Sequence, residues 1–374
     1  MQSPRHRARN RYAVFLAAAV TAGLAAACAE PQTINGVTDE VAPAAADPQA
    51  GGAVADPAAP VAPKGEVKPS AGAKAKDKGK ASDAGKATGS NGSGATGSGG
   101  SASGSLRNIS GVFWGVVGDV NTAQQRSGQP LAAHTYGVFS GKVPTDRMVT
   151  VRSEAGTWSQ VTNAAPGSTT YANIARWADT LKSRGTPVLV AYHHEPELGG
   201  NRRYGNAPEF IAAYRRVVSI FRSRGATNVS FVWQMTDWAF RTTSSDPQFA
   251  AKWYPGDKYV DVVGADAYNW YTCGHGRGRW MQLEALAGPM VAFAKAHGRK
   301  ASLPEFGSVR DSRRPAWIAE AGRWLKSQDA TMVAAFYFHH KPTHAENAEC
   351  TWPLSSASDF SAVGKLASTA TFKP

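Results

Sequence analysis

The sequence predicts an α/β fold, a (β/α)8 TIM barrel preceded by a disordered linker. Residues 29–105 consist almost entirely of Ala, Gly, Pro, Ser, Lys and Asp and hold no aromatic residue. Such a segment buries too little apolar surface to offset its ordering entropy. The remaining stretch, 106–374, is close to the ~250 residues typical of a (β/α)8 barrel. Within it, strand-like apolar runs alternate with helical patterns, as a barrel requires.

Eight apolar runs rich in β-branched or aromatic residues predict the strands. They are Ile109–Val117, Leu131–Phe139, Met148–Arg152, Pro187–His193, Val229–Met235, Val260–Ala267, Lys300–Leu303 and Met332–Phe338. The runs Val188–Ala191 and Val260–Ala267 are apolar on both faces, which is typical of parallel strands covered by helices. No glycine-rich phosphate motif follows any of them, so the pattern favours a barrel over a nucleotide-binding sheet.

Helical periodicity separates several of these strands. The expected helices are Thr170–Ser183, Pro208–Arg224, Trp280–His297, Arg314–Gln328 and Ser358–Ala367.

The first 27 residues are expected to be a signal peptide. Four arginines precede an apolar run, Tyr12–Ala27, that ends in small residues before Cys28. The run is too short and wrongly flanked for a permanent membrane span. Two alternatives remain: Cys28 is lipidated and anchors the chain to the outer face of the membrane, or the leader is cut and the protein is secreted. In both, 28–105 is a disordered tether.

The net charge is +13, of which about +10 belongs to residues 106–374. The arginines are scattered rather than gathered in a basic arm, so we expect no nucleic-acid partner. An anionic polysaccharide stays open as a partner. We expect a monomer.

Two glutamates end predicted strands on the barrel's functional face. Glu195 ends the fourth strand and Glu305 the seventh, and in this architecture chemistry sits at the carboxyl ends of strands. Retaining glycosidases need such a pair, one carboxyl acting as acid and base and the other as nucleophile. Aromatic residues around the mouth fit the apolar faces of sugar rings.

Three stretches carry a resemblance to a known family. Tyr192-His193-His194-Glu195, the run from Trp253 to Trp270 beginning Trp-Tyr-Pro-Gly-Asp, and Glu305-Phe306-Gly307 together resemble glycoside hydrolase family 26, known mainly for β-mannanases.

The resemblance implies a retaining (β/α)8 enzyme with Glu195 as general acid/base and Glu305 as nucleophile. It further implies that His194 orients the sugar and the carboxyls, that Tyr268 hydrogen-bonds the nucleophile, and that Trp270 is a sugar platform.

The loops around the expected cleft depart from the mannanase pattern. Pro196–Arg203 follows the acid/base where Asn-Gly and a Trp-rich loop are usual, and Gln234-Met235 ends the fifth strand. The expected function is a retaining endo-β-glycosidase, with β-1,4-mannan as first substrate. The alternatives are mixed-linkage β-glucan, β-1,3-xylan or an anionic polysaccharide bound by loop arginines, and a non-catalytic wall-tethered carbohydrate-binding protein.

Several site residues keep two interpretations. His134 is either a sugar contact or a satisfied core histidine. Trp114 and Trp238, like Trp158 and Trp352, are platforms or barrel packing. Glu197 competes with Glu195 as acid but more simply caps the loop.

The histidines and cysteines are the remaining candidates. Adjacent pairs such as His193-His194 and His339-His340 point to opposite faces of a strand, so we expect no metal and no cofactor. Cys273 and Cys350 follow the sixth and eighth strands, and in an exported protein they most simply form a disulfide joining two mouth loops.

Overall fold

A computed structural model describes residues 33–34, 37–38, 106, 109–154, 156–340 and 350–374. In this part of the chain, eight parallel strands run in sequence order and the last pairs with the first, which closes a barrel. The strands are β3 (Val112–Gly118), β4 (Ala132–Val138), β5 (Met148–Arg152), β6 (Val188–Tyr192), β7 (Val229–Thr236), β8 (Val262–Asn269), β9 (Lys300–Ser308) and β10 (Met332–His339). The predicted (β/α)8 fold is confirmed.

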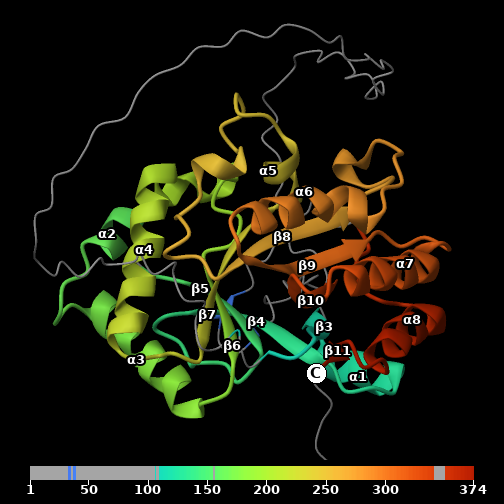
Figure 1. Cartoon of the computed structure of the whole chain (residues 1–374), viewed down its shortest axis with the longest axis horizontal. Coiled ribbons are helices and arrows are strands. Elements are labelled where there is room, and N and C mark those ends of the chain that lie inside the picture. Colours follow the sequence, from blue (N-terminus) through green and yellow to red (C-terminus); the bar gives the residue numbers. More distant parts are fainter. Residues whose placement is uncertain (1–32, 35–36, 39–105, 107–108, 155, 341–349) are drawn as a thin grey trace, which may run out of the picture.

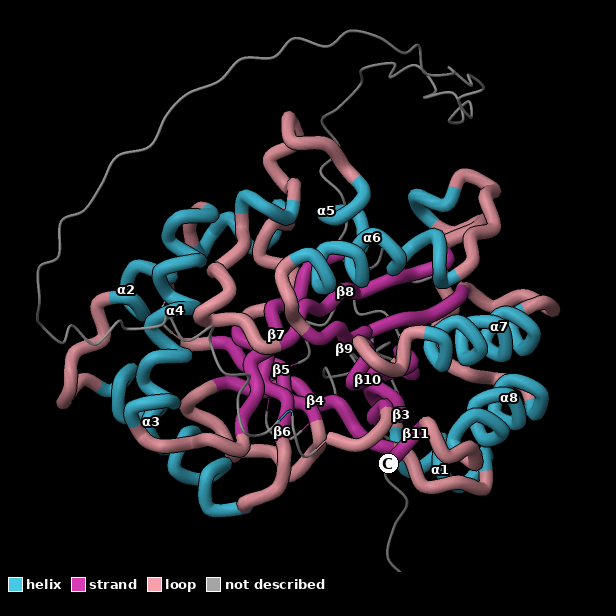
Figure 2. The backbone as a smooth tube through the Cα atoms, viewed as in Figure 1, coloured by secondary structure: helices cyan, strands magenta, loops and turns pink. Residues whose placement is uncertain are grey.

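Helices surround the barrel, α2 to α4 on one flank and α6, α7, α8 and α1 on the other (Figures 1 and 2). The helices are α1 (Val120–Ser127), α2 (Trp158–Thr162), α3 (Thr169–Arg184), α4 (Ala207–Ser223), α5 (Asp237–Arg241), α6 (Leu283–Ala296), α7 (Arg314–Ser327) and α8 (Ala357–Ala367). The core lies inside the barrel and between the strands and this helical layer.

Every predicted strand and helix is present; β5 has the predicted ends and the others are shifted at one or both ends. The largest shift is in the seventh strand, expected to end at Leu303, because β9 continues through Glu305 to Ser308. The short helices α1, α2 and α5 were not predicted. A two-residue strand, β11 (Phe372–Lys373), pairs with the start of β3.

The connection between β4 and β5 contains no helix. Arginines of α3 instead bind its backbone carbonyls: Arg176 donates to Phe139 and Gly141, at 2.5 and 2.8 Å. Arg184 donates to Val143 at 3.0 Å and also to Pro144. These bonds satisfy carbonyls that a helix would otherwise pair internally.

The expected leader, 1–27, and Cys28 lie outside the described residues, so lipidation stays a prediction. Within the expected linker, β1 (Thr33–Ile34) pairs antiparallel with β2 (Val37–Thr38). Among the described residues, no helix has the length and apolar character needed to cross a membrane.

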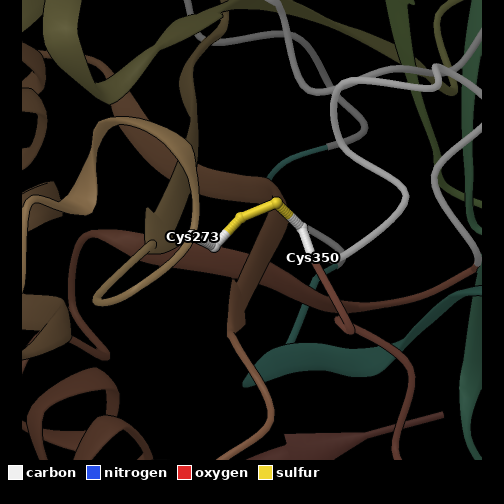
Figure 3. Close-up of a disulfide and its surroundings, with 2 residues drawn as sticks. All are labelled: Cys273 and Cys350. Atoms are coloured by element: carbon white, nitrogen blue, oxygen red, sulfur yellow. A yellow bond between two sulfur atoms is a disulfide. The ribbon is translucent and has the colours of Figure 1, made fainter.

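Cys273 and Cys350 form a disulfide, as expected (Figure 3). Their Cα atoms are 5.5 Å apart, and the two cysteines are separated by 77 positions in the sequence. The disulfide joins the segment after β8 to the segment that leads into α8, both at the carboxyl end of the barrel.

A cavity of about 300 Å³ lies at the other end of the barrel, lined by the starts of β4 and β6 and by Pro374.

Candidate active site

Glu305 lies at an irregularity in β9, where the pairing register shifts against both neighbouring strands. Between Ser302 and Glu305, β9 contains one residue more than β8, and a matching register shift separates β9 from β10. The extra residue falls in the Leu303-Pro304 stretch, and proline, which has no N–H, is tolerated at a bulge. Bulges re-aim side chains next to active sites, and here the Glu305 carboxyl meets two tyrosines.

Both oxygens of the Glu305 carboxyl accept hydrogen bonds from phenols. Tyr136 donates to Oε1 and Tyr268 donates to Oε2. Burial raises the pKa of Glu305 to about 8, whereas hydrogen bonds donated to a carboxylate favour its charged form. The two tyrosines therefore supply the stabilisation that an ionised Glu305 requires.

Glu195 sits on strained backbone directly after β6. Glu195 has φ +46° and His193 has φ +56°, a left-handed region that residues other than glycine seldom adopt. Such strain persists where surrounding bonds over-determine it and it clusters at active sites. The Glu195 N–H donates to the carbonyl of Gln234 at 3.0 Å, and its carbonyl accepts from Asn201 Nδ2 at 2.8 Å.

Tyr268 links the two glutamates. Burial raises the pKa of its phenol well above its usual value, and the nearby carboxyls of Asp266 and Glu195 raise it further in their ionised forms. Glu195 is thus close enough to act electrostatically on the phenol that binds Glu305. The structure places both predicted catalytic carboxyls, each 3% exposed or less, around the carboxyl end of the barrel.

Aromatic rings cover one side of this site. Trp352 is buried against Tyr268 and Trp270, with ring centroids 4.7 and 5.0 Å apart. Trp270 itself is only partly buried. Trp238, directly after β7, is 46% exposed. Among the described residues, it is the exposed large apolar side chain. Trp270 and Trp238 are therefore the two candidate platforms.

The histidines after β6 face different surroundings. The partly buried His194 ring lies 5.2 Å from the Tyr136 ring, beside the nucleophile's donor. His193 is buried among Trp158 and Tyr204, and burial lowers its pKa to about 3. Among the described residues, no three His, Cys, Asp or Glu side chains are grouped so as to hold a metal.

His134 is a core residue. Its side chain is 2% exposed, and its ring nitrogens lie 2.9 Å from the Pro304 carbonyl oxygen and 2.8 Å from Thr150 Oγ1. Both nitrogens are therefore engaged inside the barrel. Of the two interpretations of this histidine, the structure favours the core.

Trp114 corrects an expectation. Its ring is 1% exposed, packs against Phe306 and Phe372, and donates from Nε1 to the Val363 carbonyl of α8. Successive side chains of β3 point to opposite faces, and Trp114 points toward the helical layer. It therefore packs the core and is not a substrate contact. Trp158 is buried likewise.

Glu197 serves a different purpose from Glu195. Its Oε1 accepts from the backbone N and the hydroxyl of Thr236, both at 2.7 Å. It thereby ties the β6 loop to the end of β7, in agreement with the capping interpretation. Burial raises its pKa to about 7.

The model of glycosyl hydrolase family 26 matches residues 132–344. The chain belongs to this family. The match places it among the glycoside hydrolases and includes both glutamates, both tyrosines and most strands of the barrel.

Relatives of this family 26 chain are distant. Over 197 residues it is 27% identical to Endoglucanase H of Acetivibrio thermocellus, a match that covers 50% of this chain but 20% of that protein. The chain thus spans about a fifth of that relative's length. A family 26 β-mannanase from Bacteroides ovatus aligns with 13% identity and TM-score 0.48, over 72% of this chain and 93% of the other. An endo-β-1,4-mannanase from Cellulomonas fimi aligns with 16% identity and TM-score 0.47, over 73% and 74%.

Tyr136 was missed by the sequence analysis, although a signal was present. It lies two residues after His134 on one strand, so both side chains point to the same face. Thr150 and Asp266 carry a similar signal, since each is a polar residue in a strand that is otherwise largely apolar and buried.

Proposed function

We propose that this family 26 protein is a retaining endo-β-glycosidase in which Glu195 is the general acid/base and Glu305 the nucleophile. The observation that carries the proposal is the double phenol clamp on Glu305, because a carboxyl held by two donors at the carboxyl end of a barrel suits an ionised nucleophile. The family membership and the nearby Glu195 support it.

The proposed reaction has two displacements. Protonated Glu195 donates its proton to the glycosidic oxygen while the Glu305 carboxylate attacks the anomeric carbon, and the alcohol leaves. Water then attacks the glycosyl-enzyme, Glu195 removes its proton, and Glu305 is released with the anomeric configuration retained. His194 and Trp270 would contact the sugar beside the reacting centre.

Neighbouring glutamates provide a matched test of these roles. Glu305→Gln and Glu195→Gln should each lower hydrolysis by several orders of magnitude, whereas Glu197→Gln, two residues along the same loop, should retain far more activity. Release of reducing ends from a panel of β-glycans measures all three. Activity of Glu305→Gln near that of the unmodified protein would refute the assignment.

For substrate, β-1,4-mannan is the first choice. The sequence motifs resemble a family known mainly for β-mannanases, although the relative from Acetivibrio thermocellus is named an endoglucanase. Mixed-linkage β-glucan and β-1,3-xylan are therefore the first alternatives, and the same panel ranks them by kcat/KM.

A specific observation favours an anionic glycan as second candidate. Arg202 and Arg203 on the β6 loop and Arg277 and Arg279 on the β8 loop are all exposed at the carboxyl end of the barrel. An anionic substrate predicts a KM that rises steeply with salt, because exposed charges are screened. A neutral substrate predicts a KM nearly independent of salt.

The non-catalytic alternative makes a separate prediction. A wall-tethered binding protein would retain polysaccharide without releasing reducing ends.

The proposed location, a secreted or lipid-anchored protein at the cell surface, is supported by the leader pattern ending at Cys28. Replacing Cys28 with Ser and following the protein between membrane and medium distinguishes anchoring from secretion.

A further inference from the structure

The peptide group between Pro304 and Glu305 is bound at both ends by side chains from other strands. The Pro304 carbonyl oxygen lies 2.9 Å from Nδ1 of His134 on β4. The Glu305 N–H lies beside the carboxyl of Asp266 on β8, where it acts as a donor that lowers the pKa of that carboxyl. The bulge shifts the register of β9 against β8 just before the pair Asp266–Glu305 and against β10 between Leu303 and Phe306, and these side-chain contacts support the backbone at that point.

The two ends are joined through the barrel interior. His134 Nε2 lies 2.8 Å from Thr150 Oγ1 on β5, which lies 2.8 Å from Gln234 Oε1 on β7. Gln234 Nε2 lies 2.8 and 3.0 Å from the two Asp266 oxygens. The side chains therefore form a closed ring with the Pro304–Glu305 peptide, and all four are 2% exposed or less.

The Pro304–Glu305 peptide determines which atoms of this ring donate hydrogen bonds and which accept them. A carbonyl oxygen only accepts, so His134 Nδ1 must carry a hydrogen, and a peptide N–H only donates, so an Asp266 oxygen must accept. If Asp266 is ionised, it accepts from the Gln234 amide, Gln234 accepts from Thr150, and Thr150 accepts from His134 Nε2. His134 must then carry hydrogens on both nitrogens. That arrangement buries a carboxylate and an imidazolium on opposite sides of the ring.

If Asp266 is protonated, the ring closes without charge. Its hydroxyl donates to Gln234 Oε1, the Gln234 amide donates to Thr150, Thr150 donates to His134 Nε2, and neutral His134 donates to Pro304. This needs only a half turn of the Gln234 amide, which exchanges its oxygen and nitrogen. The two arrangements contain the same number of protons, and separated charges in a buried site are costly.

The surroundings of the ring favour the neutral arrangement. Burial raises the pKa of Asp266 well above its usual value and the nearby acids Glu197 and Asp237 raise it further, against the opposing effects of the contacts with Gln234 and the Glu305 N–H. Burial lowers the pKa of His134 to about 3, and neighbouring His194 lowers it further, against a smaller opposing effect of the Pro304 bond. Tyr136 and Phe336, whose rings pack on His134, bring no negative charge to stabilise an imidazolium.

We propose that Asp266 is a protonated acid in a one-directional hydrogen-bond ring through Gln234, Thr150 and His134, and that this ring positions the nucleophile by clamping the Pro304–Glu305 peptide. The proposal extends the proposed function, on which its catalytic part rests. The four side chains are positioning residues: His134 and Asp266 contact the peptide from which Glu305 projects, and Thr150 and Gln234 connect these two side chains. Tyr136 and Tyr268 hold the Glu305 carboxyl.

Deleting the hydroxyl in the middle of the ring tests the positioning. Thr150→Val keeps the shape of the side chain and breaks the ring, so kcat should fall roughly ten- to a hundredfold, the scale of a displaced reacting group, with little change in KM. Thr150→Ser, which restores a hydroxyl, should recover most of the loss. Ser302→Ala is the matched control, because Ser302 is buried on β9 and its hydroxyl has no hydrogen-bond partner in the described structure. A Thr150→Val kcat within about twofold of the Ser302→Ala value would overturn the positioning.

Infrared spectroscopy tests the protonation without requiring activity. The full-length protein at pH 7 should show a carboxylic-acid C=O band that disappears in Asp266→Asn, and aspartate labelled with ¹³C at the side-chain carbonyl should shift that band. Asn supplies the same donor and acceptor as a protonated acid, so this variant should fold with nearly unchanged stability. Loss of carboxylate bands instead of an acid band would overturn the neutral ring. If the unmodified protein cleaves no polysaccharide, the proposed function fails while the infrared result still decides the ring.

Discussion

The buried ion pair between Arg314 and Asp359 should dominate the acid stability of the barrel. Arg314, at the start of α7, and Asp359, in the first turn of α8, are 1% and 2% exposed. Arg314 donates to both Asp359 oxygens, at 3.2 and 2.5 Å, and also to the carbonyls of Thr351 and Trp352. The pair thus holds the segment that places Trp352 against Tyr268.

The magnitude follows from two independent considerations. Burial disfavours the charged carboxyl, yet hydrogen bonds from Arg314 and from the Ser355 and Ser356 backbone outweigh it and lower the pKa of Asp359 from 3.8 to about 2. That shift corresponds to about 2 kcal/mol of stability at neutral pH. Breaking a buried pair by removing one partner typically costs about 3 to 5 kcal/mol, because the other charge stays buried. We therefore expect Asp359→Asn to lower the free energy of unfolding by about 3 kcal/mol.

The pH dependence has a definite sign. Because the folded pKa lies below the unfolded value, the contribution is complete above about pH 4 and is lost as the pH falls toward 2. Urea unfolding of the full chain, by circular dichroism, measures the difference between Asp359→Asn and the unmodified protein. That difference should shrink as the pH falls from about 4 to about 2.

A matched control separates burial from pairing. Asp179 and Arg224 form the same two-pronged contact, at 2.9 and 2.5 Å, but both side chains are 44% exposed. Asp179→Asn should change unfolding far less, since exposed pairs contribute little. Equal effects of the two substitutions, or a difference independent of pH, would refute the reasoning.

Three further predictions concern the site and its support. Tyr136→Phe removes a donor to Glu305, so the pKa of this carboxyl should rise and the acidic limb of the kcat/KM profile should move to higher pH; an unmoved limb would contradict the phenol clamp. Removing the disulfide with Cys273→Ser and Cys350→Ser should cost about 2 to 4 kcal/mol of unfolding free energy, seen in urea, and should abolish the response to reductant that the unmodified protein shows. Trp238→Ala should raise KM several-fold with kcat retained if this exposed ring is a sugar platform; Phe should restore KM, and an unchanged KM in the Ala variant would remove Trp238 from the cleft.

Local patterns predicted most of the fold. Runs such as Met148–Arg152 are short, apolar and β-branched, and the periodic helix patterns between them left little choice but a parallel barrel. The short helices were missed because five to eight residues carry too little periodicity to stand out. Trp114 shows the limit of residue type alone: a tryptophan on a strand fits either face, and only the phase of β3 decides that it faces α8.

The active site was partly predictable for the same reason. Glu195 and Glu305 stand at strand ends, where the fold concentrates chemistry, and each lies in a recognisable motif. The partners of Glu305 lie on β4 and β8, and only closure of the sheet brings Tyr136 and Tyr268 to one carboxyl. No spacing along the chain encodes that meeting.

Pro304 explains why the nucleophile needs support from so many strands. A proline inside a central strand removes a ladder donor, and the predicted seventh strand ended at Leu303, directly before Pro304. The structure shows β9 continuing through a bulge to Glu305, which pairs with Asp266 of β8, and the side chains of His134 and Asp266 also contact the Pro304–Glu305 peptide. The bulge shifts the register of β9 by one residue just before Glu305, whose carboxyl meets the two phenols, and the polar interior of the barrel adds a side-chain contact to the neighbouring Pro304 carbonyl. A sequence with Glu305 but without this interior would form the strand and misplace the carboxyl.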